Sequence, residues 1–129
     1  MGNKKDVMPS ETEWLVMEVL WESGVSLPSS EIIERLKGTK EMSPKTVRVL
    51  LNRLYQKKMV DYTIDPKDSR VYHYFPKRTK EECQQEKSRQ FAESYFAGNR
   101  MGALASLVES FDLSDEQMQA LKEILGQEK

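Results

Sequence analysis

The side chains best placed to do chemistry in this chain are cations gathered in one short segment. The stretch from residue 43 to residue 58 contains no Asp or Glu and five cations, which are Lys45, Arg48, Arg53, Lys57 and Lys58. Lys and Arg bind phosphate oxygens, and both also donate hydrogen bonds to guanine in the major groove of DNA. This segment is therefore suited to binding a polyanion rather than to making or breaking bonds.

Residues for catalysis and metal binding are scarce. The 129 residues include one His, His73, and one Cys, Cys83. A Ser-His-Asp or Cys-His arrangement would need one of these two, and neither lies in a recognisable motif. A multi-thiolate metal site needs more than one cysteine, which one chain does not have. We expect His73 to be an ordinary strand residue and Cys83 an unreactive thiol in a polar run. The sequence thus predicts no enzyme activity, no metal and no cofactor.

The formal net charge of −1 conceals an asymmetry along the chain. Residues 1–78 hold 14 Lys and Arg against 11 Asp and Glu, whereas residues 79–129 hold 6 against 10. A basic and an acidic portion suggest two tasks. We predict two domains with these boundaries, 1–78 and 79–129.

The basic segment is predicted to be a helix that starts at Ser43 and Pro44, an N-cap followed by proline at the first helical position. Val47, Leu50, Leu51 and Leu54 are spaced to face a core. The predicted DNA-binding face comprises the remaining residues Lys45, Thr46, Arg48, Val49, Asn52 and Arg53. These are residue types that read base edges and phosphates, with Lys57 and Lys58 as further phosphate-binding cations. The alternative is a merely solvated cationic surface.

The flanking elements complete a recognisable order. A capping box at Ser10 and Glu13, with Thr12 as an alternative cap, predicts a helix over 10–23, and a short helix opens at Pro28. Strands are predicted over 60–64 and 71–75, joined by a turn-rich tip. Three helices and a hairpin define a winged helix-turn-helix, so the fold class is mainly α with a small β-hairpin.

The hairpin tip carries two more cations. Lys67 and Arg70 are predicted to touch phosphate or the minor groove. Ordinary turn chemistry is the alternative, because Asp65 and Asp68 offset their charge locally.

The acidic portion is predicted to be helical and to dimerise. Its helices are expected from Thr79 to near Gly98, around residues 104–111, and from Ser114 onward. The dimerisation residues are predicted to be Leu104, Leu107, Val108, Phe111, Leu121, Ile124 and Leu125. These apolar side chains are too many to leave exposed to water, and the same surface of a second copy can bury them. The sequence therefore predicts a homodimer. The alternative is that these helices fold back on the winged domain.

Four segments resemble the BlaI/MecI/CopY family of bacterial transcriptional repressors. They are Glu13–Trp21, Ser43–Arg48 (S-P-K-T-V-R), Arg53–Lys58 (R-L-Y-Q-K-K), and Ser106–Val108 through Asp112–Ser114. The resemblance implies a homodimer whose winged-helix domains occupy a palindromic double-stranded DNA operator and whose helical C-terminal domain joins the subunits. By position, the six exposed residues of the basic helix would face the operator.

Two branches of the family respond to different signals, and this sequence shares only part of the features that each branch uses. In the antibiotic-responsive branch a membrane metalloprotease system triggers cleavage of an Asn–Phe bond in the C-terminal domain. Ser110 and Phe111 occupy that place here, so this bond is the candidate for regulatory cleavage, although Ser110 departs from the pattern. In the copper-responsive branch the C-terminus carries a cysteine-rich metal site, which one cysteine cannot provide.

Two other functions stay open at this point: a winged-helix module that binds an acidic protein surface, and a ligand-sensing regulator. In the second, the aromatic group Phe91, Tyr95 and Phe96 could line a pocket, or could equally be a helix-packing seam. No apolar stretch reaches the roughly 18–20 residues that span a bilayer, and the polar start over residues 1–6 lacks a signal-peptide core. We therefore expect no membrane insertion and a cytoplasmic location.

Overall fold

The structure is a computed structural model that describes residues 7–127. The chain divides into two compact units, the first ending at Lys87 and the second beginning at Ser88. The outer limits of the predicted domains, residues 1 and 129, lie outside the described residues.

Three helices open the first unit, and local capping explains their starts. Helix α1 (Glu11–Ser23) begins with a capping box between Ser10 and Glu13, so Ser10 rather than Thr12 is the cap. It ends at Gly24, whose φ of 72° is the left-handed conformation that glycine adopts without strain. Helices α2 (Ser29–Leu36) and α3 (Pro44–Gln56) follow, and these predictions are confirmed.

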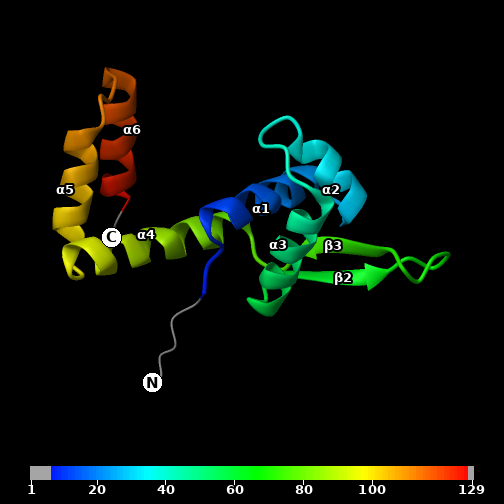
Figure 1. Ribbon diagram of the computed structural model, residues 1–129. Coiled ribbons are helices and arrows are strands. Elements are labelled where there is room, and N and C mark those ends of the chain that lie inside the picture. The colour runs from blue at the N-terminus through cyan, green and yellow to red at the C-terminus, as the bar shows by residue number, and fades with distance from the viewer. Residues whose placement is uncertain (1–6, 128–129) are drawn as a thin grey trace. The chain divides into compact units, whose positions relative to one another are not determined.

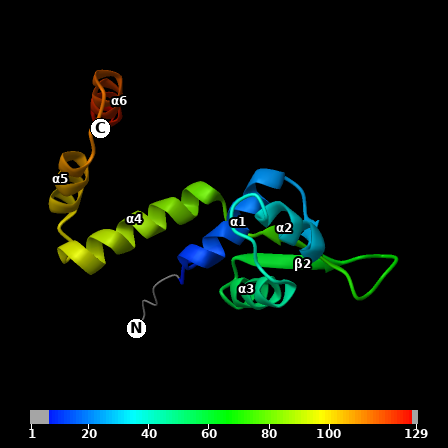
Figure 2. The ribbon, with the colours of Figure 1, turned by 45° about the horizontal axis from the view of Figure 1, so that its top comes forward.

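The strands form one small antiparallel sheet in the order β1-β3-β2. They are β1 (Leu27–Pro28), β2 (Val60–Ile64) and β3 (Tyr72–Pro76). In Figures 1 and 2 the loop between β2 and β3 projects beyond the helices, as expected of a wing. The predicted hairpin is confirmed, whereas β1 was not predicted, because it exists only through its pairing with β3.

One hydrophobic core joins the three helices to the sheet. It includes the whole predicted stripe of α3, since Val47, Leu50, Leu51 and Leu54 are all buried. Cys83 is fully buried in the same core, which its polar sequence neighbours did not indicate. Burial raises the pKa of the Cys83 thiol, which keeps it protonated near neutral pH.

Helix α4 (Lys80–Phe96) begins as part of the first unit. The Trp21 indole N–H donates to the Arg78 carbonyl oxygen at 2.8 Å, and the Lys80 ammonium donates to the Glu18 carboxylate at 2.9 Å. Together with Cys83 in the core, these bonds attach the first turns of α4 to α1. The first unit therefore extends past residue 78, where the sequence places the domain boundary.

The second unit holds the rest of α4 together with α5 (Arg100–Ser110) and α6 (Asp115–Gly126). Asn99 caps α5, and a capping box between Ser114 and Gln117 starts α6. Between residues 88 and 127 only Ala103 is buried, so this unit encloses almost no core within one chain. No helix in the described part of the chain is long and apolar enough to cross a membrane.

Candidate nucleic-acid interface

The solvent-facing side of α3 carries the predicted face. The exposed residues on this helix include Lys45, Thr46, Arg48, Val49, Asn52 and Arg53. The Ser43 hydroxyl accepts the Thr46 amide and fixes the helix start, and the first turn contains no acid. The remaining amide groups and the positive end of the helix dipole add to the side-chain charge. The result is a cationic surface with amide, hydroxyl and methyl groups among the charges.

Lys57 does not belong to that free surface, contrary to the prediction. Its ammonium donates to the Glu13 carboxylate at 2.5 Å and to the Met8 carbonyl oxygen at 3.3 Å. The side chain of Glu13 is 3% exposed and that of Lys57 is 24% exposed. The pair therefore joins the end of α3 to the start of α1 across the core.

Glu13 is ionised in this setting. Burial alone would raise the pKa of Glu13, but the hydrogen bonds from Lys57 and from the Ser10 amide outweigh burial, with help from the charges of Lys57 and Arg53. The pKa therefore lies below its ordinary value of 4.5. The negative charge of Glu13 in turn neutralises Lys57, which reduces the cation count available to a polyanion.

Lys58, by contrast, is exposed and lies in an unusual backbone conformation. Its φ is 64°, the left-handed region that glycine usually occupies at a helix end. The Lys58 and Met59 amides donate to the Tyr55 and Leu54 carbonyl oxygens, which is the Schellman pattern of helix termination. A lysine here carries backbone strain while presenting its charge beside α3.

The wing tip is organised by its two aspartates. The Asp65 carboxylate accepts the Lys67 and Asp68 amides and lies 2.9 Å from the His73 ring nitrogen. Asp68 pairs with both the Nε and a terminal nitrogen of Arg70. The hydrogen bond from His73 lowers the pKa of Asp65, and that from Arg70 lowers the pKa of Asp68.

The two predicted cations of the tip therefore differ in whether an aspartate of the tip is bonded to their side chains. Arg70 forms an ion pair with Asp68, although its side chain remains 88% exposed. Lys67 is also exposed at the tip. His73 is a half-buried strand residue, as expected. Among the described residues, no three His, Cys, Asp or Glu side chains are grouped to hold a metal ion.

A tyrosine cluster lies where α3 meets the hairpin, and the sequence analysis did not anticipate it. Tyr62 stacks on Tyr72 with ring centroids 4.4 Å apart and an interplanar angle of 7°. Tyr55 of α3 and Tyr74 of β3 also contact Tyr62, at 5.4 and 5.8 Å. The spacing of Tyr72 and Tyr74 could have shown that these two share one face of a strand. The strand register that adds Tyr62 and the contact with Tyr55 depend on the fold.

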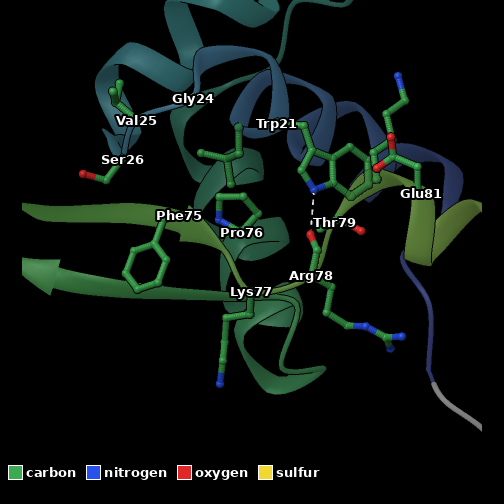
Figure 3. A pocket seen from close by; sticks show the side chains of 12 residues that line it. Trp21, Gly24, Val25, Ser26, Phe75, Pro76, Lys77, Arg78, Thr79 and Glu81 are labelled. Atoms are coloured by element: carbon green, nitrogen blue, oxygen red, sulfur yellow. Dashed lines mark hydrogen bonds between the residues drawn. The ribbon is translucent and has the colours of Figure 1, made fainter.

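The first unit also contains a hollow of about 510 Å³ between the end of α1, the end of β3 and the start of α4. Figure 3 shows the Trp21 indole over this hollow, bonded to the Arg78 carbonyl. No residue of α3 lines it, and none of the aromatic group Phe91, Tyr95 and Phe96 does. Those three rings instead contact each other, with Phe91 5.6 Å from Tyr95 and 5.5 Å from Phe96.

Most of the predicted dimerisation residues are open to solvent within one chain. Phe111 is 58% exposed, Ile124 61%, Leu125 53% and Leu107 38%. Leu104, Val108 and Leu121 are partly buried. The candidate cleavage position lies at the end of α5, where Ser110 and Phe111 are both exposed.

The cationic helix on a three-helix core, beside a β-hairpin wing, defines a winged-helix protein of the kind that binds DNA. The chain belongs to the penicillinase repressor family, because the sequence model of that family matches residues 9–127. This confirms the family resemblance and the winged-helix fold class.

Individual relatives agree with this assignment. The chain is 30% identical over 117 residues to the methicillin resistance regulatory protein MecI of Staphylococcus aureus strain N315, covering 91% of this chain and 92% of that protein. It is 30% identical over 126 residues to the penicillinase repressor of Bacillus licheniformis, covering 98% and 95%. The solution structure of the DNA-binding domain of the repressor BlaI matches with 32% identity and a TM-score of 0.50, covering 60% of this chain and 89% of that domain.

Proposed function

We propose that this protein is a dimeric, sequence-specific transcriptional repressor that occupies a palindromic DNA operator. The observation that carries the proposal is the exposed face of α3, where Lys45, Arg48 and Arg53 surround Asn52 without any acid on the helix. Membership of a repressor family and similarity to a DNA-binding domain support it. Such a repressor works beside the bacterial chromosome, in the cytoplasm.

The proposed mechanism divides recognition between bases and phosphates. Arg48 and Asn52 are suited to guanine and adenine edges, and the methyl groups of Thr46 and Val49 to thymine. Lys45, Arg53, Lys58 and Lys67 supply charge for phosphates. Two copies of α3 about one helical turn of DNA apart would double the contacts and match a palindrome.

A footprint over the gene's own upstream region tests the proposal. The expected result is one protected palindrome at moderate salt, together with weaker, salt-dependent binding to random duplex DNA. A module that binds an acidic protein instead would show neither, and that outcome would reject the proposal.

Substitutions on α3 test its residue assignments. Arg48→Ala and Asn52→Ala should each cost about 1–3 kcal/mol of binding free energy and relax the preference at particular base pairs. Glu34→Ala, an exposed change on α2, is the control and should leave binding to every duplex unchanged. Equal losses on operator and random DNA would contradict base contacts by Arg48 and Asn52.

We also propose the Ser110–Phe111 bond as the position at which a regulatory protease would inactivate the repressor. Exposure of both residues at the end of α5 supports this. Mass spectrometry of the chain from cells in which its target genes are induced should find a fragment ending at Ser110. Full-length protein alone, under full induction, would exclude this route.

A further inference from the structure

The face of the hairpin that carries the tyrosines continues the exposed surface of α3. Alternate strand residues share a face, and the register pairs Tyr62 with Tyr74 and Ile64 with Tyr72. Val60, which has the same parity, is buried in the core, whereas Ile64 is 52% exposed. The face is thus covered by helices at one end and emerges into solvent toward the wing tip.

Tyr55 connects this face to α3. It lies three residues after Asn52 and seven after Arg48, so the three side chains follow one strip of the helix. Tyr55 also contacts the Tyr62 ring at 5.4 Å. A continuous surface therefore runs from Arg48 along α3 and onto the hairpin, with Tyr55 40% and Tyr72 37% exposed.

The ring geometry limits what these tyrosines can contact. Tyr62 covers one face of Tyr72 in a nearly parallel stack, and Tyr55 packs against Tyr62. The ring faces in contact are closed to an unpaired base, which needs a free face on which to stack. Their hydroxyls and ring edges remain, which suit a phosphate oxygen and the apolar side of a deoxyribose.

We propose that Tyr55 and Tyr72 contact the DNA backbone, with their hydroxyls donating hydrogen bonds to phosphate oxygens where the duplex passes from α3 to the wing. This inference rests on the proposed function. The cations on either side of the cluster, Arg48 on α3 and Lys67 at the tip, favour the same polyanionic partner. Tyr62 is the positioning residue, because its ring holds the other two.

The test measures binding of the full chain to two probes, a random-sequence duplex and a duplex selected by the unaltered protein, over a range of salt. Tyr55→Phe and Tyr72→Phe keep the rings and remove only the hydroxyls. Each should weaken binding to both duplexes by about 3- to 10-fold. The slope of log affinity against log salt should not change, because a neutral hydroxyl releases no counterion. Tyr95→Phe, a 76% exposed tyrosine of the second unit, is the matched control and should bind as the unaltered protein does.

The outcomes separate this inference from the function on which it rests. If Arg48→Ala weakens binding while the double Tyr55→Phe/Tyr72→Phe variant does not, the backbone contact is wrong and the repressor function stands. A loss confined to the selected duplex would also overturn it, because that would indicate base readout. If the unaltered protein binds neither duplex, the proposed function itself fails. Nitration of Tyr55 and Tyr72 should in addition slow on adding either duplex, with Tyr95 as the internal control.

Discussion

At the scale of single residues, Lys57 and Lys58 show how neighbouring cations take different roles. Lys57 is bound to a buried carboxylate and a carbonyl oxygen, whereas Lys58 is exposed. A count of charges along the helix would treat both as phosphate ligands. The structure leaves only Lys58 available, so the two should respond differently to removal of charge.

Replacing each lysine with glutamine tests this difference. Lys57→Gln leaves the Glu13 carboxylate without its cation in the protein interior, so we expect a loss of about 2–4 kcal/mol in the free energy of unfolding. Its effect on the salt dependence of DNA binding should be small. Lys58→Gln should barely alter stability but lower the magnitude of the salt slope by about 1. Urea unfolding and gel shifts at several salt concentrations measure both quantities, and a reversed pattern would contradict the assignment.

The Glu13–Lys57 pair also predicts a dependence of stability on pH. Because the pKa of Glu13 is lowered in the folded protein, its stabilising contribution is fully present above the unfolded-state pKa. That contribution is lost as pH falls through the folded-state pKa. Glu13→Gln should therefore be less stable than the unaltered protein at neutral pH, and the difference should shrink in acid. Urea unfolding across this range tests the sign, and a difference that grows in acid would refute it.

At the scale of elements, the end of α3 combines a tight turn with a strained residue. Lys58 occupies the position at which helices usually place glycine, with φ at 64°. Strain of this kind often persists where a side chain has a functional use. Here the use would be a positive charge held at the end of the recognition helix.

Lys58→Gly separates strain from charge when it is compared with Lys58→Gln. Both variants lose the same charge and should lose DNA affinity to a similar degree. Only glycine relieves the backbone, so its free energy of unfolding should exceed that of the glutamine variant by about 0.5–1 kcal/mol. Thermal and urea unfolding provide the comparison. Equal stability of the two variants would show that the turn is not strained.

The elements also show which features a sequence can predict. Caps at Ser10, Ser43 and Ser114 were predictable because their partners lie three residues away. The partner of Lys57 lies 44 residues away, and β1 exists only through its pairing with β3. For the same reason the core role of Cys83, which extends the first unit into α4, is invisible in its polar run. Local sequence patterns predicted the helices and the hairpin. How these elements pack on one another depends on contacts between residues far apart in the sequence.

The candidate site divides in the same way. The exposed face of α3 followed from helical periodicity, which depends only on local spacing. The tyrosine cluster depends on how the hairpin closes and where it meets α3, whereas the Asp68–Arg70 pair lies within one turn and could be expected from local spacing. Charge patterning therefore located the candidate interface on α3, whereas the tyrosine cluster and the pairing of Lys57 with Glu13 could be found only from the fold.

At the scale of the whole molecule, the two units differ in what they enclose. The first has a continuous core from α1 to the start of α4, whereas Ala103 is the one buried residue between 88 and 127. A segment this short that leaves Phe111, Ile124 and Leu125 more than half exposed buries too little apolar surface to be stable in water alone. A second copy of the same segment would cover such a surface symmetrically.

Charged substitutions in the second unit test this arrangement. Ile124→Glu places a carboxylate where we expect the partner subunit, so sedimentation should shift from dimer to monomer. Operator affinity should then fall by about 10²- to 10³-fold, because each winged domain binds its half-site without a linked neighbour. Val25→Glu changes an equally exposed apolar residue of the first unit, 62% against 61%, and should leave the dimer intact. Unaltered tryptophan fluorescence would show that the first unit of Ile124→Glu remains folded. If Ile124→Glu and Leu125→Glu both remain dimeric, the subunits meet through another surface.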